Sequence, residues 1–152
     1  MKMELEPIGV IHSPYKEIGD APPQGRMKKD VVFQIEVFPQ FVSGLKDIDT
    51  ATHIIVLYWL DKADREKLVV KTPWDEEPHG VFATRSPARP NPIAFDIADL
   101  VEVKGNILFV RGLDALEGSP LIDIKPYSQT DSVPGARLGW FEKAVQGKKN
   151  PF

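Results

Sequence analysis

The sequence predicts an all-β protein with mainly antiparallel strands, folded as a small β-barrel with a few short helices. Short segments rich in Val, Ile and Phe recur along the chain, and helical periodicity is scarce. The 14 prolines and 11 glycines are spread over all 152 residues rather than pooled in a linker, so we expect a single domain, 1–152. Many short strands between turn residues are typical of a barrel or a sandwich, and closing a barrel also hides the sheet edges.

The strand signal comes from alternation and from turn residues. Val31, Phe33, Ile35 and Val37 alternate with other residues, as expected for a strand with one buried face. Residues 104–106 read Lys-Gly-Asn, a tight-turn signal that predicts an antiparallel hairpin between 97–103 and 106–111. The expected strands are residues 8–12, 31–38, 53–60, 80–84, 93–103, 107–111 and 121–125.

Helical pattern is confined to three short pieces, at 38–45, 61–67 and 136–146. The last piece contains Gly139-Trp140-Phe141, which we expect to pack on the chain's own barrel rather than on a partner subunit. No run approaches the roughly 18 apolar residues needed to span a bilayer, and the N-terminus lacks the apolar core of a signal peptide. We therefore expect a cytoplasmic protein without a membrane partner.

Composition excludes several kinds of chemistry. The chain has no cysteine, which rules out disulfides, thiolate nucleophiles and thiolate metal sites. The formal charge of −3 gives no global attraction for nucleic acid, so an RNA partner would have to be held by a local basic patch. His12, His53 and His79 are far apart in sequence and each adjoins a predicted strand, so we expect no metal site.

The most distinctive segment is residues 85–92, which carry two arginines and one asparagine among three prolines. Proline fixes φ and removes a backbone donor, so this segment must be a stiff, irregular loop. Arginines on a pre-ordered loop lose little freedom on meeting an anion or a planar base, which favours a recognition loop. A rigid surface turn with solvated arginines is the equally weighted alternative.

Two further loops carry polar residues. Residues 13–26 form a long stretch without periodic signal, and residues 114–120 read Asp-Ala-Leu-Glu-Gly-Ser-Pro between two strands. Beyond the second loop, Leu121, Asp123 and Lys125 alternate with Ile122 and Ile124, which places Asp123 and Lys125 on one strand face. Such a charge pair is usually solvated unless its face lines a cleft.

Read together, the segments HSPYK, GVFATRSPARPNPI and LDALEGSPLIDIKPY closely resemble the TsaA-like family, and the match runs in order from about Glu6 to about Tyr127. The best-known members of that family are tRNA threonylcarbamoyladenosine methyltransferases. The resemblance implies a β-barrel enzyme that uses S-adenosylmethionine to methylate the exocyclic N6 of threonylcarbamoyladenosine beside the tRNA anticodon. It also implies a homodimer, with the tRNA anticodon loop as the partner.

Carried over block by block, the resemblance assigns eleven residues to the cofactor. Asp61-Lys62 stands where bacterial members carry a His-Gln pair, and Glu117 stands where they carry Asp. The implied cofactor-binding residues are Pro23, Gln24, Gly25, Asp61, Lys62, Arg85, Phe95, Ala115, Leu116, Glu117 and Gly118.

Methyl transfer to a weakly nucleophilic nitrogen requires loss of a proton, which predicts a nearby base. Asp123 and Asp114 are the catalytic candidates by location, with His53 as the titratable alternative. The residues assigned to the substrate are Arg89, Asn91, Lys125 and Tyr127.

Two other functions remain open from the sequence. One is a cofactor-binding relative that methylates a different small-molecule or nucleoside acceptor, in keeping with the acidic charge balance. The other is a non-catalytic module whose proline-rich loops bind RNA or a protein. The first predicts cofactor binding without tRNA binding, and the second predicts no cofactor binding.

Overall fold

A computed structural model describes residues 1–22, 28 and 30–147. The chain divides into two compact units, which are described separately. The first comprises Met1–Asp61 and Ile93–Ser128, and the second comprises Lys62–Pro92 and the described part of the chain after Ser128.

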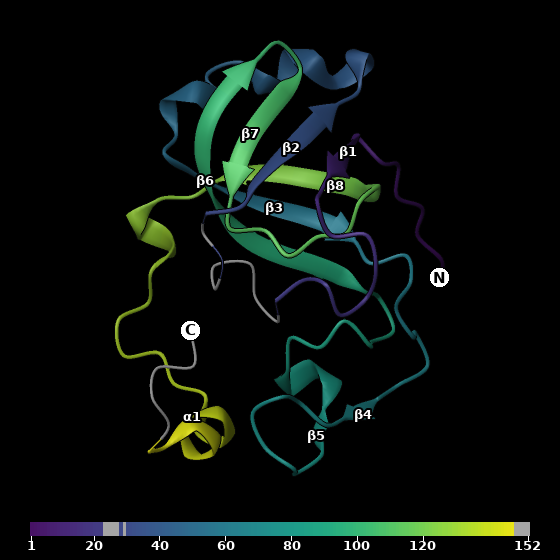
Figure 1. Cartoon of the computed structure of the whole chain (residues 1–152), viewed down its shortest axis with the longest axis vertical. Helices are drawn as coiled ribbons and strands as arrows, with labels where there is room; N and C mark the ends of the chain where they lie inside the picture. The colour runs from purple at the N-terminus through teal and green to yellow at the C-terminus, as the bar shows by residue number, and fades with distance from the viewer. Residues whose placement is uncertain (23–27, 29, 148–152) are drawn as a thin grey trace. The chain divides into compact units, whose positions relative to one another are not determined.

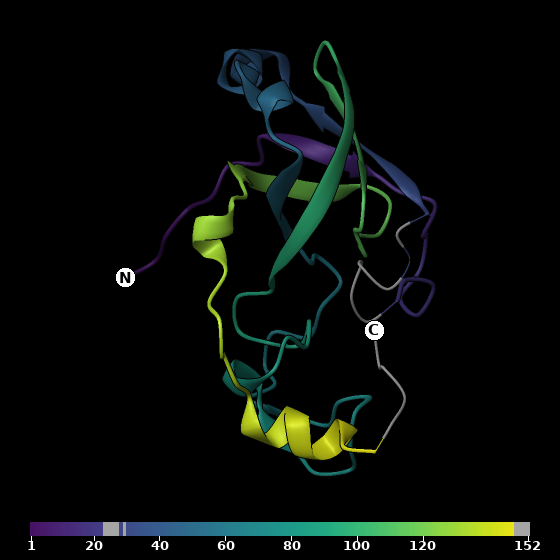
Figure 2. The same ribbon diagram turned by 90° about the vertical axis from the view of Figure 1, so that its left-hand side faces the viewer.

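The first unit is a closed barrel of antiparallel strands, seen from two directions in Figures 1 and 2. Around the ring the order is β1-β2-β7-β6-β3-β8, and pairing of β8 with β1 closes it. This confirms the predicted all-β barrel. The strands are β1 (Gly9–His12), β2 (Val32–Val37), β3 (His53–Trp59), β6 (Ile93–Lys104), β7 (Ile107–Arg111) and β8 (Ser119–Pro126).

The predicted hairpin is β6 and β7. Lys104 pairs with Ile107, and Gly105 adopts a φ of 59° in the turn between them, a left-handed conformation that glycine reaches without strain. The Asn106 side chain then donates a hydrogen bond to the Val37 carbonyl at 2.9 Å, which ties the turn to the end of β2.

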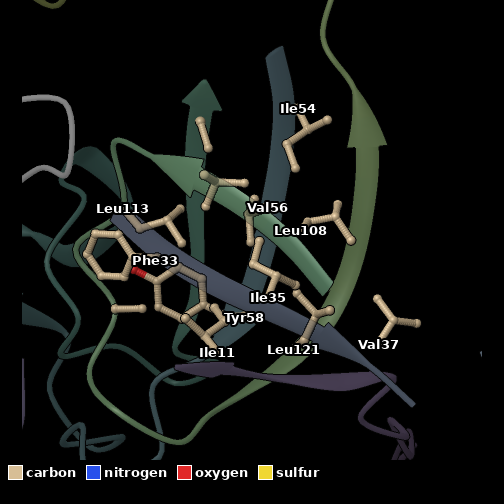
Figure 3. Packing of buried hydrophobic residues seen from close by; sticks show 13 residues of the cluster. Ile11, Phe33, Ile35, Val37, Ile54, Val56, Tyr58, Leu108, Leu113 and Leu121 are labelled. Atoms are coloured by element: carbon tan, nitrogen blue, oxygen red, sulfur yellow. The ribbon is translucent and has the colours of Figure 1, made fainter. Parts of the chain in front are cut away.

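The barrel interior is filled by alternate residues of its strands. Phe33 and Ile35 of β2 and Ile54, Val56 and Tyr58 of β3 are at most 1% exposed. Figure 3 shows the rings of Phe33 and Tyr58 close to Leu113 at one end of this packing, with Val37 at the other end. The buried cluster comprises Ile11, Phe33, Ile35, Val37, Ile54, Val56, Tyr58, Ala98, Leu108, Val110, Leu113, Ala115 and Leu121.

Strand β8 contains a β-bulge that changes which of its residues face the core. Tyr58 pairs with Leu121 but Leu57 pairs with Asp123, so the register shifts by one residue at Ile122. Leu121 therefore lies in the core, while Asp123 shares the outer face with Leu57. Ile124 returns to the inside and packs against the core. Simple alternation puts Leu121 and Asp123 on one face, and the bulge separates them.

The second unit contains little regular structure. Its elements are the paired strands β4 (Val69–Val70) and β5 (His79–Gly80), the 3-10 helices η4 (Val81–Ala83) and η5 (Gln129–Asp131), and the α-helix α1 (Gly139–Val145). Helix α1 confirms the helix predicted within 136–146. The 38–45 piece is the 3-10 helix η2 (Pro39–Leu45) of the first unit, which also holds the short 3-10 helix η3 (Ile48–Thr50).

Two predicted elements are wrong. The strand expected at 80–84 is mostly the 3-10 helix η4, because the Thr84 N–H and hydroxyl both donate to the Val81 carbonyl and turn the chain back. The helix expected at 61–67 is absent from this described stretch. There the Asp64 carboxylate accepts the Glu66 N–H at 2.9 Å, an Asx-type turn that competes with a helix.

Trp140, which we expected to pack on the barrel, makes contacts within the second unit. Its ring stacks on His79 with centroids 3.9 Å apart, and its indole N–H donates to the Ala83 carbonyl at 2.8 Å. Phe141 meets Trp74 edge to face at 5.4 Å. Helix α1 is thereby held by the aromatic residues of its own unit. Across the described chain, no helix is both long and apolar enough to cross a membrane.

Candidate functional site

One end of the barrel gathers a set of interacting polar residues from the first unit. The segment after β1 and the loop 112–118 between β7 and β8 meet there, because β1 pairs with β8 and places Ile11 beside Ser119. Glu117 lies at the centre. Its carboxylate accepts the His12 ring N–H at 3.2 Å, the Ser13 backbone N–H at 3.2 Å and the Lys16 ammonium at 3.3 Å.

His12 bridges two carboxylates from different elements. Its Nε2 lies 3.1 Å from Glu36 of β2, and its Nδ1 lies 3.2 Å from Glu117. The hydrogen bond to Glu36, with a smaller contribution from Glu117, raises the pKa of His12. Desolvation alone would raise the pKa of Glu117, but hydrogen bonds from Ser13, His12 and Lys16 outweigh it and lower that pKa. The doubly protonated imidazolium is the form that donates to both carboxylates.

The loop 115–118 is also fixed through its backbone. The Ser13 hydroxyl donates to the Ala115 carbonyl at 2.6 Å, the Glu117 N–H donates to the Tyr15 carbonyl at 2.7 Å, and the Gly118 N–H donates to the Ile11 carbonyl at 2.9 Å. Gly118 has a φ of 81°, which favours glycine. The four predicted residues Ala115, Leu116, Glu117 and Gly118 thus form one tethered loop, although the Ala115 side chain belongs to the core.

Beside this loop, the buried Tyr58 hydroxyl contacts two carboxylates. Its oxygen lies 2.9 Å from Asp96 and is hydrogen-bonded to Asp114. A phenol has one proton to donate, so both contacts can be hydrogen bonds only if one carboxyl group is protonated and donates to the phenol oxygen. Burial, followed by the interactions with Asp114, raises the pKa of Asp96 well above its ordinary value. Asp96 is therefore the protonated member, and Tyr58 donates to the Asp114 carboxylate.

The Tyr15 hydroxyl is buried at the same end of the barrel. The Tyr15 ring packs on Phe33 with centroids 5.7 Å apart, and its N–H donates to the Ser13 hydroxyl at 3.0 Å. The Tyr15 phenol oxygen has no hydrogen-bond partner among the residues that the structure describes. A buried hydroxyl without a partner is rare in folded proteins and calls for an explanation.

Other predicted residues lie on the outer wall of the barrel. Asp123, Leu57 and Phe95 are neighbours across β8, β3 and β6, and Phe95 is 41% exposed. The Asp123 carboxylate pairs with the Lys125 ammonium at 2.9 Å. Asp123 thus lies on the outer wall, whereas Asp114, in the loop 112–118, contacts the inward-facing Tyr58.

Tyr127 and His53 lie near the end of the same wall. The Tyr127 N–H donates to the His53 carbonyl at 3.1 Å, and the two rings meet edge to face at 6.3 Å. The His53 ring is paired with the Asp99 carboxylate at 3.1 Å. His53 is therefore on the wall, whereas the tethered loop closes the barrel end.

The proline-rich loop belongs to the second unit, where Arg89 holds it in shape. The Arg89 guanidinium donates to the backbone carbonyls of Val81 at 2.6 Å, of Thr84 at 3.1 Å and of Ser86 at 3.2 Å. Asn91 accepts from Arg65 through a long contact of 3.4 Å. The structure thus gives Arg89 a loop-shaping role, while its assignment to the substrate stays a prediction.

The remaining predicted residues fall in several places. Arg85 is exposed on the proline-rich loop, and the boundary between the two units runs between Asp61 and Lys62, both exposed. Pro23, Gln24 and Gly25 lie outside the described residues.

Sequence reasoning missed Tyr58 and Asp96 as members of the site. Both lie inside predicted strands, in which the pattern predicts a buried Tyr58 and an exposed Asp96. An inward-facing acid in an apolar strand was the available signal, because a buried carboxyl group needs a partner. The sequence predicts no metal site at His12, which adjoins a predicted strand, and the partners of its ring are Glu36 and Glu117.

One family model matches most of the chain. The family model described as the tRNA-methyltransferase O N-terminal domain matches residues 10–132. The chain belongs to this family.

Named relatives agree with that placement. The chain is 59% identical over 145 residues to a "Probable S-adenosyl-L-methionine-binding protein" of Archaeoglobus fulgidus, which covers 95% of this chain but 39% of that protein. It is 55% identical to another protein of that organism, named "S-adenosyl-L-methionine-binding protein", over 83% of this chain and 90% of that protein. The crystal structure of TrmO from Pseudomonas aeruginosa matches with a TM-score of 0.76 and 31% identity, covering 91% of this chain and 62% of that chain.

Proposed function

We propose that the chain binds S-adenosylmethionine at the end of the barrel formed by the loop 115–118. We further propose that it transfers the methyl group to the exocyclic N6 of threonylcarbamoyladenosine in tRNA. Family membership and the printed names of the relatives support the cofactor. The observation that carries the location is the tethered loop itself, which has Glu117 bound by His12, Ser13 and Lys16.

The residues at the barrel end suit this cofactor. Its sulfonium is a cation, and Asp114 adds an acidic side chain at the same end of the barrel, beside a Glu117 that is already paired with His12 and Lys16. Its adenosine part carries neutral oxygen and nitrogen acceptors, and the Tyr15 hydroxyl is a buried donor without a partner among the described residues. Because the loop is already held by three backbone or hydroxyl hydrogen bonds, little further ordering is needed on binding.

When bound, S-adenosylmethionine supplies an electrophilic methyl group on sulfur. The chain's own residues have to align the acceptor nitrogen, exclude water and take up the proton that the nitrogen loses. We propose Asp114 as the base that takes up the proton lost by the acceptor nitrogen. Its carboxyl group contacts the Tyr58 hydroxyl, whose other neighbour, Asp96, has a raised pKa and so keeps its own proton more readily. Asp123 is the weaker candidate, since Lys125 neutralises it on the outer wall.

The first test is calorimetric titration with S-adenosylmethionine. The wild-type chain should bind one equivalent, and Glu117→Gln should weaken binding about tenfold because the neutral amide holds His12 and Lys16 less strongly. Glu102→Gln is the matched control, since Glu102 is a barrel glutamate paired with Lys104 on β6. Absence of wild-type binding under folded conditions would refute the cofactor and favour the binding-module function.

The acceptor is tested separately. Purified enzyme, S-adenosylmethionine and tRNA carrying threonylcarbamoyladenosine should yield the singly methylated nucleoside by mass spectrometry. Asp114→Asn should lose turnover while it still binds the cofactor, whereas Asp123→Asn should keep turnover. Cofactor binding without methylation of this tRNA would move the search to another nucleoside or a small molecule. We also propose a homodimer, which sedimentation equilibrium tests.

A further inference from the structure

The backbone and the ring of Tyr15 are held by contacts with neighbouring residues, whereas its hydroxyl is not. Its N–H donates to the Ser13 hydroxyl, its carbonyl accepts the Glu117 N–H at 2.7 Å, and its ring packs on Phe33. Because the Tyr15 backbone is hydrogen-bonded to Glu117, the position of the ring relative to the loop 115–118 is fixed. A side chain fixed in this way does not turn easily to find another partner for its hydroxyl.

The hydroxyl itself is buried and has no hydrogen-bond partner within the described part of the chain. Leaving a buried donor unpaired costs free energy, and folded proteins keep such groups mainly where strain, solvent or a ligand accounts for them. Both backbone hydrogen bonds of Tyr15 have good lengths, at 3.0 Å and 2.7 Å. Local strain is therefore a poor explanation for the unpaired hydroxyl.

The charges around Tyr15 define what it can bind. Burial, and then the negative charges of Asp30 and Asp114, raise the pKa of Tyr15. The phenol thus keeps its proton at neutral pH and acts as a hydrogen-bond donor. An anionic acceptor would be repelled by the two carboxylates, whereas a neutral oxygen or nitrogen acceptor on a cationic ligand suits both the donor and its surroundings.

We propose that Tyr15 is a binding residue whose hydroxyl donates a hydrogen bond to a neutral acceptor atom in the adenosine part of S-adenosylmethionine. This inference rests on the proposed function, since it needs the cofactor to bind beside the loop 115–118. It adds a contact from the segment after β1 to the residues that the family resemblance assigns. The amino-acid part of the cofactor, which carries a carboxylate, would lie away from Asp30 and Asp114.

The test is Tyr15→Phe with two independent readouts. The first is the free energy of unfolding without ligand, and the second is calorimetric affinity for S-adenosylmethionine and for 5′-methylthioadenosine, which lacks the amino-acid part. The variant should be as stable as the wild type or more stable, because it removes an unpaired buried hydroxyl. It should bind both ligands about tenfold more weakly, because each loses the same hydrogen bond.

Several outcomes would overturn the inference. Lower stability with unchanged affinity would mean that solvent pairs the hydroxyl. Weaker binding of S-adenosylmethionine alone would place the contact on the amino-acid part and refute the adenosine assignment. Normal affinity of Tyr15→Phe beside a binding wild type would refute only this inference. A wild type that binds neither ligand would refute the proposed function as well.

Discussion

Asp96→Asn tests the proton that the raised pKa of Asp96 assigns to its contact with Tyr58. In the folded protein, burial and the neighbouring Asp114 raise the pKa of Asp96 well above its ordinary value of 3.8. The folded state therefore holds a proton that the unfolded state has lost. The resulting stabilisation is fully present below the unfolded pKa and is lost as pH rises through the folded pKa.

The size of the effect follows from the loss of one proton. A single group contributes at most about 1.4 kcal/mol per pH unit to the slope of the unfolding free energy. Asparagine does not titrate, and its amide nitrogen at the Oδ2 position can donate to the Tyr58 oxygen, although it cannot accept the Asp114 N–H, a long contact of 3.4 Å. The unfolding free energy of the wild type minus that of Asp96→Asn should therefore fall by up to about 2.7 kcal/mol as pH rises by two units between the unfolded and folded pKa of Asp96.

Urea unfolding followed by far-ultraviolet circular dichroism, from pH 4 to pH 9, measures this difference. Asp123→Asn is the matched control, because it makes the same chemical change on the outer wall of the barrel, where Asp123 is paired with Lys125. The control should run parallel to the wild type. If Asp96→Asn also runs parallel to the wild type at every pH, Asp96 carries no extra proton and the assigned network is wrong.

The remaining predictions concern three positions. Gly9→Ala should destabilise the barrel by about 3 kcal/mol or prevent folding, because the added Cβ would overlap the backbone carbonyl of Glu36 on the paired strand. Gly44→Ala, whose Cβ would meet open space, should be tolerated, and urea unfolding of the two variants measures the difference. His12→Gln should lower the unfolding free energy by less than about 1 kcal/mol, because the His12–Glu36 pair is partly exposed. The loss should be largest below the ordinary pKa of 6.5 and should fade as pH rises through the raised pKa of His12, so an equal loss at pH 6 and pH 9 would contradict this. Arg89→Lys should speed amide exchange across its own loop, because an ammonium cannot replace a guanidinium that donates to three carbonyls, and unchanged exchange would remove its loop-shaping role.

The barrel was predictable because its signals are local. Alternation in residues 31–38 and the Lys-Gly-Asn turn each act over a few residues, and the structure reproduces both as β2 and the β6–β7 hairpin. The wrong strand at 80–84 and the wrong helix at 61–67 share one cause. In each, a short side chain hydrogen-bonds to nearby backbone, through Thr84 and Asp64, and that local bond outweighs the apolar or helical pattern.

Strand β6 shows why the network around Tyr58 was not predictable. The alternation in β6 predicts that its larger apolar residues, Phe95 and Ile97, face the core. The structure instead turns Asp96 and Ala98 inward and leaves Phe95 41% exposed. The large side chains of β2 and β3 already fill the interior, so β6 contributes small residues there. That choice depends on the volume of the whole barrel, which no single strand reveals.

The tethered loop depends on closure in a similar way. His12 and Glu117 are 105 positions apart, and no sequence spacing links them. They meet because β1 pairs with both β2 and β8, which brings the end of β1 between Glu36 and the loop. A sequence can therefore nominate residues 115–118 as a functional loop, but the bonds that hold the loop come from barrel closure. Substitutions in β1 that leave the loop sequence intact should accordingly alter ligand binding as strongly as changes within the loop.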